Sequence, residues 1–153
     1  GPVIYWSKRV GKNDKFFMMP KFRTMKEGVP PLATQLVTNP DDYLTKIGSF
    51  LRNTSLDEVP QLYSIIEGRM TFVGPRPALF NQEDLIELRK NNGVNTIKPG
   101  ITGWAQVNGR DDLTVREKVN FDSEYLDRKS FSFDIYIVWL TLLRVLKRDG
   151  VNH

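Results

Sequence analysis

Pro60 constrains the fold of this chain more than any other single residue, because it lies inside the acidic stretch Arg52–Leu62. A proline within a helix removes one backbone hydrogen bond, and it disfavours the helical conformation of the residue before it. A helix in this stretch therefore either starts at Pro60 or has a bent first turn. Both alternatives place Asp57 and Glu58 at or before the positive end of a helix, which keeps carboxylates ionised and attracts phosphate.

The tetrapeptide Ser55–Glu58 also has a purely structural interpretation. Ser55 and Glu58 have the spacing of a capping box, and acidic side chains in a first turn stabilise any helix. From this tetrapeptide alone, that interpretation is favoured over catalysis. Adjacent side chains of a helical turn point about 100° apart, so Asp57 and Glu58 are able to have different roles, one attacking a substrate and the other binding a metal ion.

The side chains that the chain lacks exclude several kinds of site. It has no cysteine, and its one histidine is His153, the last residue. Disulfides, thiolate nucleophiles and cysteine- or histidine-rich metal sites are excluded, and a Ser–His–Asp triad would depend on the chain terminus. The remaining ligand types favour Mg²⁺ over zinc. A net charge of +4 suits an anionic small substrate, an anionic membrane surface or nucleic acid.

The pattern of apolar residues predicts a single α+β domain, mostly helical with short strands, over residues 1–153. We expect a β-hairpin over residues 3–19, with a solvated face that carries Lys8, Arg9 and Lys12. Caps and helical spacing predict helices over residues 40–52, 60–67, 81–91, 115–126 and 133–147. Strands are predicted at 70–73 and 104–107, a tight turn at 98–103 and a loop at 28–38.

The helix predicted at 133–147, with Ser132 as its cap, has a wide apolar surface and a basic end at Arg144 and Lys147. The local sequence favours a buried core helix. The alternative is an amphipathic helix that lies in a membrane interface, with its basic end on anionic headgroups. The chain contains no run of about 18 apolar residues, the length that a membrane-spanning helix needs.

Two further motifs have the chemistry of phosphate binding. Gly74–Pro77 places Arg76 between two prolines, which restricts its backbone before a ligand binds and suits bidentate contacts to phosphate. A rigid turn with a solvated arginine is an equally good interpretation. Lys98–Arg110 contains glycines that permit close backbone approach, followed by the polar residues Gln106 and Arg110. It lacks the spacing of a Walker P-loop, and an ordinary loop, strand and turn is its alternative.

Taken in their order along the chain, these motifs resemble those of the bacterial sugar transferases, the monotopic polyprenyl-phosphate phosphoglycosyl transferases. The matching stretches are KFRTM at 21–25, LRNTSLDEVPQL at 51–62, FVGPRP at 72–77, KPGITGWAQVNGR at 98–110 and LKRDG at 146–150. The resemblance covers essentially the whole chain. Members of this family carry a hydrophobic segment that dips into one leaflet, upstream of the stretch that opens this sequence. We therefore expect a catalytic domain without its membrane-inserting segment.

The resemblance implies transfer of a phosphosugar from a UDP-sugar to polyprenyl (undecaprenyl) phosphate with release of UMP. This reaction initiates surface glycans such as O-antigen lipopolysaccharide, capsule and exopolysaccharide, at the cytoplasmic face of the bacterial plasma membrane. By family position, Asp57 attacks the sugar-linked phosphorus to form a covalent phosphosugar–enzyme, and Glu58 helps to hold Mg²⁺. The residues implied in phosphate and nucleotide contacts are Lys21, Arg23, Arg52, Arg76 and Arg110. Support roles are expected for Pro75, Pro77, Gln106, Asp122 and Asp134.

Two other functions are compatible with parts of the sequence. A basic nucleic-acid-binding module would combine stacking aromatic residues with basic ones on one surface, whereas the aromatic residues here fall mostly on apolar helix faces. A soluble phosphohydrolase would use Asp57 and Mg²⁺ in the same way as the transferase, with water as the acceptor. The nature of the acceptor therefore separates the last alternative from the transferase.

Overall fold

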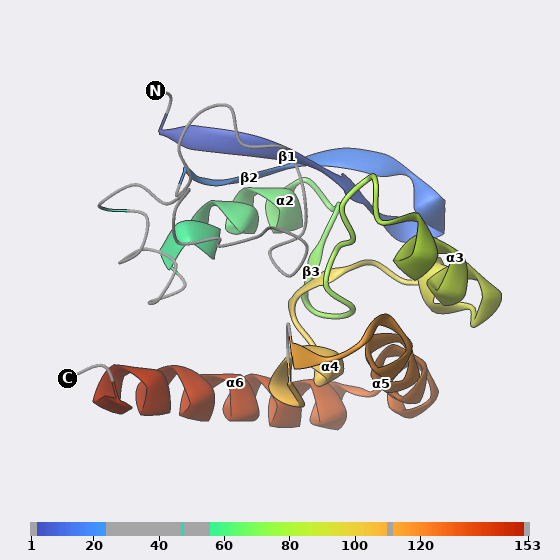
Figure 1. The fold of residues 1–153 in the computed structure, drawn as a ribbon. Coiled ribbons are helices and arrows are strands. Elements are labelled where there is room, and N and C mark those ends of the chain that lie inside the picture. The colour runs from blue at the N-terminus through green and yellow to red at the C-terminus, as the bar shows by residue number, and fades with distance from the viewer. Residues whose placement is uncertain (1–2, 24–46, 48–55, 110–111, 152–153) are drawn as a thin grey trace.

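A computed structural model describes residues 3–23, 47, 56–109 and 112–151 of the chain. Helices and short strands form an α+β domain, which confirms the predicted fold class (Figure 1). The loop predicted at 28–38 and the helix predicted at 40–52 lie outside the described residues, apart from the helical Ile47.

The chain opens with an antiparallel hairpin of β1 (Ile4–Val10) and β2 (Phe16–Phe22). The short 3₁₀ turn η1 (Lys12–Asp14) connects the two strands. Asn13 and Asp14 reverse the chain there with φ angles of 58° and 61°, in the left-handed region that asparagine and aspartate adopt more readily than other non-glycine residues. The predicted hairpin is confirmed.

The two faces of the hairpin differ in what covers them. Phe17 and Met19 point inward and pack on Met70. Lys8 is exposed, but Arg9, the next residue along β1, is only 7% exposed. The prediction of a solvated basic face is therefore wrong for Arg9, because strand alternation turns its side chain to the opposite side from Lys8.

The acidic stretch starts a helical segment. The 3₁₀ helix η4 (Leu56–Gln61) contains Pro60 and continues directly into α2 (Leu62–Ile66). The helix thus has the altered first turn that was one of the two alternatives, and it does not start at Pro60. Asp57 and Glu58 lie in the first turn of η4.

The centre of the domain is a pair of parallel strands, β3 (Thr71–Val73) and β4 (Gly100–Thr102). The strand predicted at 70–73 is confirmed, but the turn predicted at 98–103 is wrong because it contains β4. A Cβ atom on Gly100 would overlap the backbone of Gly74. The glycines of this segment therefore allow the backbones of β3 and β4 to approach closely enough to pair.

The segment predicted as a strand at 104–107 is a short helix, α4 (Trp104–Val107). Its aromatic residue explains the difference. The ring centroid of Trp104 lies 5.1 Å from that of Phe133 and 6.4 Å from that of Phe121, both in edge-on geometry. Packing of this ring between two helices outweighs the strand propensity of a short apolar run.

The helices before and after α4 begin or end where local sequence signals predict. Gly93 ends the first of them with a φ of 76°, as predicted from its position after the last apolar residue. Thr114 begins the second with the predicted capping box, in which its hydroxyl accepts from the amide of Glu117 and its own amide donates to the Glu117 carboxylate. The helical elements are α3 (Glu83–Asn91), η5 (Val94–Thr96) and α5 (Val115–Arg128).

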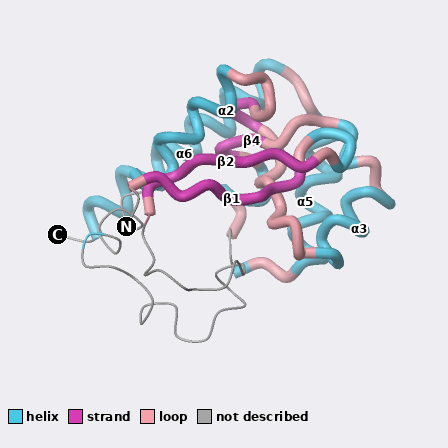
Figure 2. Tube along the Cα trace, turned by 90° about the horizontal axis from the view of Figure 1, so that it is seen from above, coloured by secondary structure: helices cyan, strands magenta, loops and turns pink. Residues whose placement is uncertain are grey.

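The long last helix α6 (Phe131–Val151) lies on the opposite side of the domain from the hairpin, with β3 between them (Figure 1). Its cap is Ser130, whose hydroxyl accepts from the amide of Phe133, and not the predicted Ser132. Phe133 and Ile137 are buried in a core cluster, so one face of α6 belongs to the core. Seen from above, α3 and α5 lie together at one end of the hairpin (Figure 2).

We expect the Gly100→Ala variant to lose about 4 kcal/mol or more of unfolding free energy, because the new methyl group overlaps backbone that cannot move aside. The matched control is Gly93→Ala, where the Cβ would meet only a Leu126 methyl group at 3.8 Å. Its left-handed backbone should cost about 1–2 kcal/mol. Urea denaturation followed by circular dichroism measures both, and equal losses would contradict the close approach of β3 and β4.

Candidate active site

Glu58 and Arg76 form an ion pair at the surface of the domain. Nη1 of Arg76 lies 3.1 Å from Oε1 of Glu58, and the side chains are 35% and 16% exposed. Glu58 comes from η4 and Arg76 from the turn that follows β3. The guanidinium is therefore the more accessible partner of the pair.

Asp57, the neighbour of Glu58 in η4, is 6% exposed. The strand β2 packs against η4 on the side of the hairpin. The two consecutive carboxylates thus have different surroundings, one nearly enclosed and the other reaching Arg76. Different surroundings are what neighbouring side chains of a helical turn are expected to have.

The backbone that carries Arg76 is held by donors from outside the turn. Pro75 and Pro77 have no N–H group, so the turn has few donors of its own for its carbonyl groups. Four consecutive carbonyls instead accept from three other segments, β4, α3 and β1, at distances of 2.6–2.9 Å. The pairs are Gly100 N with Pro75 O, Arg89 Nη1 with Arg76 O, Arg9 Nη1 with Pro77 O, and Val10 N with Ala78 O.

Asp122 fixes the arginine that holds the Arg76 carbonyl. Its Oδ2 accepts from Nε of Arg89 at 2.9 Å, and the side chains are 2% and 10% exposed. Burial raises the pKa of Asp122, while the charge and the hydrogen bond of Arg89 act in the opposite direction. Asp122, a predicted support residue, therefore acts on the Arg76 backbone indirectly, through Arg89.

Arg9 approaches the same turn from the hairpin. Its Nε donates to the Ser7 hydroxyl at 2.8 Å and its Nη1 to the Pro77 carbonyl at 2.9 Å. Burial and then the positive charge of Arg76 lower the pKa of Arg9 to about 9, while the negative charge of Glu58 raises it. Sequence reasoning missed this residue, although the alternation of exposed Lys8 with Arg9 was the signal that could have found it.

The other predicted basic contacts are only partly described. Lys21 lies opposite Tyr5 in the hairpin register, and its Nζ is 6.0 Å from the Tyr5 ring centroid. The guanidinium carbon of Arg23 is 5.6 Å from the same centroid. Both cations therefore meet at Tyr5, at the open end of the hairpin. Arg52 and Arg110 lie outside the described residues.

Asp134 and Gln106 connect α6 to the rest of the domain. Oδ1 of Asp134 accepts from the Tyr125 hydroxyl at 2.7 Å, and that hydroxyl lies 3.4 Å from the Val73 carbonyl. Burial and Asp134 raise the pKa of Tyr125. The backbone carbonyl of Gln106 accepts from Nη1 of Arg144 at 2.7 Å. Both residues therefore stabilise the attachment of α6 in this structure.

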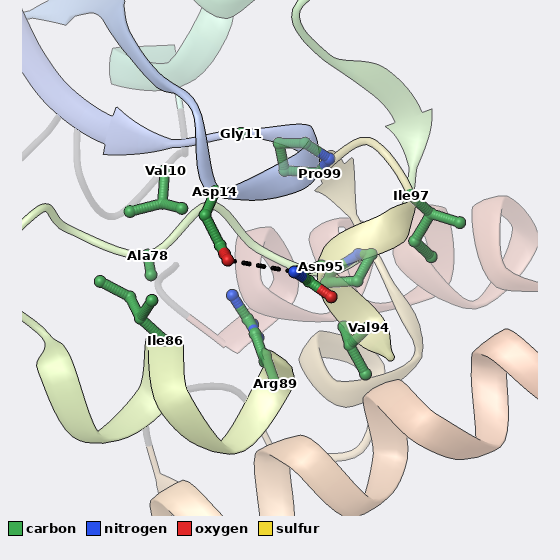
Figure 3. A pocket seen from close by; sticks show the side chains of 11 residues that line it. Val10, Gly11, Asp14, Ala78, Ile86, Arg89, Val94, Asn95, Ile97 and Pro99 are labelled. Atoms are coloured by element: carbon green, nitrogen blue, oxygen red, sulfur yellow. Dashed lines mark hydrogen bonds between the residues drawn. The ribbon is translucent and has the colours of Figure 1, made fainter. Parts of the chain in front are cut away.

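A small cavity, lined in part by Pro75 and Ala78 of the same turn, lies next to α3 (Figure 3). Arg89 points into it, and Nδ2 of Asn95 donates to Oδ2 of Asp14 at 3.0 Å across it. Neither Asp57 nor Glu58, both among the described residues, lines this cavity. It is therefore separate from the acidic pair.

The described part of the chain contains no group of three or more acidic or histidine side chains that could hold a metal ion. Magnesium sites that act on phosphates commonly use one or two carboxylates and take the remaining ligands from substrate phosphates and water. The partly exposed Glu58, next to Asp57, fits that pattern. The donor set therefore suits a magnesium ion that arrives with an anionic substrate.

The model of the family described as bacterial sugar transferase matches residues 1–148 of this chain. The chain belongs to that family. The resemblance drawn from the five motifs is thereby confirmed. Several relatives of the chain have names that describe the transfer of sugar phosphates.

Three relatives illustrate the range of this family. The chain is 43% identical to the UDP-glucose:undecaprenyl-phosphate glucose-1-phosphate transferase of Escherichia coli, over 94% of this chain and 32% of that protein. It is 36% identical to the undecaprenyl-phosphate galactose phosphotransferase of Salmonella typhimurium, over 98% and 34%. It is 38% identical to the exopolysaccharide production protein ExoY of Rhizobium meliloti, over 98% and 73%. The chain thus spans about a third of the first two relatives and most of the third.

We expect Asp122→Ala to lower the unfolding free energy by about 3–5 kcal/mol, because it leaves the buried guanidinium of Arg89 without its anionic partner. Replacing both partners, as in Arg89→Met with Asp122→Leu, should recover much of that loss. The control is Glu124→Ala on the same helix, whose ion pair with Arg128 is exposed and should contribute less than about 0.5 kcal/mol. A loss for Asp122→Ala no larger than for the control, in urea denaturation, would show that the buried pair does not hold the turn.

Proposed function

We propose that this bacterial sugar transferase moves a phosphosugar from a UDP-sugar to undecaprenyl phosphate, releases UMP, and thereby initiates a surface polysaccharide. The observation that supports this most directly is the ion pair between Arg76 and Glu58, the residue that follows Asp57 in the chain. The backbone of Arg76 is held in place by a hydrogen bond from Arg89. The names of two relatives, which describe transfer of glucose 1-phosphate and galactose phosphate with undecaprenyl phosphate, agree with it.

Asp57 acts as the nucleophile in this proposal. One carboxylate oxygen forms a bond to the phosphorus that carries the sugar, and the bond from that phosphorus to the bridging oxygen breaks. The bonding electron pair leaves with UMP. An oxygen of undecaprenyl phosphate then attacks the same phosphorus, forms the polyprenyl diphosphate sugar and restores the Asp57 carboxylate.

Charge decides whether the first step occurs, since a diphosphate repels an approaching carboxylate. Arg76 binds phosphate oxygens with its exposed guanidinium, while Glu58 and the clamped backbone orient it. Glu58 would also hold Mg²⁺ in this proposal, and the ion would further neutralise the diphosphate charge. Both devices lower the electrostatic cost of bringing Asp57 to phosphorus.

The remaining basic residues extend the same anion site. We assign phosphate and nucleotide contacts to Lys21, Arg23, Arg52 and Arg110 on their family positions. Asp122 supports the site through Arg89, and Asp134 supports it through Tyr125 and β3. Pro75 and Pro77 restrict the turn that carries Arg76, while Gln106 helps to attach α6.

Two alternatives predict other acceptors or partners. A phosphohydrolase would use water as the acceptor of the phosphosugar on Asp57, whereas the names of two relatives include undecaprenyl phosphate, which favours transfer to a lipid acceptor. Family membership leaves the nucleic-acid-binding module without support. The transferase is therefore the function that the observations favour.

The exposed face of α6 supports attachment to a membrane surface. Its large apolar side chains are 44–82% exposed: Phe131, Ile135, Tyr136, Trp139, Leu142, Leu143 and Leu146. None of the helices in the described ranges is both long enough and apolar enough to cross a bilayer. A helix with an apolar face of this kind lies in the interface, with the apolar face in the acyl boundary. The cytoplasmic face of the bacterial plasma membrane, which the family resemblance implies, is the surface that we propose for this contact.

Incubation of the full-length protein with UDP-sugar labelled in the sugar phosphate, without lipid acceptor, should leave label covalently bound to the protein. We expect Asp57→Asn to abolish this label, because an amide is a poor nucleophile towards phosphorus. Asp127→Asn, an exposed aspartate on α5, serves as the matched control and should retain the label.

Retention of label by Asp57→Asn would exclude Asp57 as the nucleophile. With undecaprenyl phosphate added, the label should move to the lipid. Free sugar phosphate as the main product under those conditions would favour the phosphohydrolase.

Flotation with liposomes that contain anionic lipid tests the α6 surface in the chain Gly1–His153. We expect binding by this chain and a loss of at least about tenfold in the Leu142→Glu, Leu146→Glu double variant, because charges in the acyl boundary are unfavourable. The control is Asn91→Glu with Asn120→Glu, which changes the net charge equally at exposed positions of α3 and α5. Equal flotation of both double variants would argue against α6 as the membrane contact.

A further inference from the structure

The inward face of the hairpin changes in character along its length. Strand alternation places Phe17, Met19 and Lys21 of β2 on this one face. Phe17 and Met19 are buried in a core cluster against which Ile65 of α2 also packs. Lys21, at the open end of the hairpin, is half-buried. The inward face is therefore apolar where it covers α2 and basic at its open end.

Tyr5 adds an aromatic ring to this basic end from the opposite strand. It pairs directly with Lys21, and directly opposed residues of an antiparallel pair lie on the same face. Arg23 continues the row of Lys21 just beyond β2, where its amide donates to the Val3 carbonyl at 2.8 Å. The centroid of the Tyr5 ring lies 6.0 Å from Nζ of Lys21 and 5.6 Å from Cζ of Arg23. Two cations therefore share one ring.

The inward face is also the side on which the acidic stretch lies. α2 lies beneath the hairpin (Figure 1), and η4, which leads into α2, packs against β2. η4 carries Asp57 in its first turn. On the outer face, Nζ of the exposed Lys8 lies 4.6 Å from the centroid of the Phe16 ring. Of these two cation–π contacts, the one at Tyr5 is therefore on the side of the proposed nucleophile.

We propose that Tyr5 is a positioning residue for the diphosphate of the UDP-sugar, and that it acts through Lys21 and Arg23. This inference rests on the function proposed above, in which both cations contact phosphate. The face of an aromatic ring attracts cations through its quadrupole. The ring therefore restricts two long side chains to the open end of the hairpin before a ligand binds, which reduces the entropy lost when they contact phosphate.

Positioning of this kind affects substrate binding more than the chemical step. The contacts between the Tyr5 ring and the two cations are the same when the UDP-sugar binds and when Asp57 reaches the phosphorus. Their loss should destabilise the bound substrate and the transition state equally. We therefore expect substitutions of Tyr5 to raise KM and to leave the rate at saturating substrate nearly unchanged.

The test measures capture of label from UDP-sugar in single turnovers of the full-length protein, at varied substrate concentration. We expect Tyr5→Leu to raise the substrate concentration that gives half-maximal capture about fivefold or more, with the maximal rate changed less than about twofold. Tyr5→Phe keeps the ring and should stay within about twofold of the wild type in both quantities. The matched control is Phe16→Leu, which removes a ring beside Lys8 on the outer face and should leave both unchanged.

Fluorine atoms on the ring separate attraction of the cations from packing. Tyr5→Phe variants that carry successive ring fluorines keep nearly the same size, while the negative charge on the face of the ring decreases. Because the attraction of a cation depends on that charge, we expect the half-maximal substrate concentration to rise stepwise with each fluorine. This series also gives a result if the Tyr5→Leu variant fails to fold.

A half-maximal concentration that stays constant along the fluorine series would overturn the role of Tyr5, even if Tyr5→Leu is impaired, because packing alone explains that combination. A fall in the maximal rate at an unchanged half-maximal concentration would also overturn it. A wild-type protein that captures no label would overturn the proposed function and this inference with it. Capture by the wild type and by all Tyr5 variants alike would overturn the inference alone.

Discussion

The carbonyl groups of the turn Pro75–Ala78 are the point on which the rest of the structure depends. Two prolines remove the N–H groups with which this turn would otherwise stabilise itself, so its acceptors must be satisfied from elsewhere. The donors come from the hairpin, from α3 and from β4, which are far apart in the sequence. Arg76 is therefore oriented only when these elements have all packed together. A rigid backbone under an exposed guanidinium reduces the entropy that binding an anion would cost.

Charge is distributed unevenly around that turn. On the α3 side, Arg89 and Asp122 form a buried pair in which the charges balance. On the hairpin side, Arg9 donates to the Pro77 carbonyl, and Arg76 forms a partly exposed ion pair with Glu58. Buried donors on both sides therefore position the backbone of the turn, while the guanidinium of Arg76 stays accessible to a ligand.

The sequence predicted the elements whose signals are local. The hairpin turn, the glycine end of α3 and the capping box of α5 each depend on a few consecutive residues. Prediction from the sequence failed where the local structure depends on contact with a residue far along the chain. Trp104–Val107 reads as a strand, but Trp104 packs against Phe133 of α6. Arg9 was assigned to solvent because the carbonyl that it holds belongs to a residue 68 positions away. The acidic pair was found from its local pattern and from the family motif, and the catalytic roles of Asp57 and Glu58 stay predictions until label capture is measured.

The attachment of α6 connects the proposed membrane contact with the anion site. Asp134, in the first turn of α6, accepts from Tyr125, whose hydroxyl lies 3.4 Å from the carbonyl of Val73. Val73 ends β3, and the turn that carries Arg76 begins with the next residue. If the apolar face of α6 rests on a bilayer as proposed, a path of this kind would fix the height of the candidate site above it. The phosphate of a polyprenyl acceptor lies at the level of the lipid headgroups, so a fixed height would hold Asp57 within reach of that phosphate without a hinge between the helix and the site.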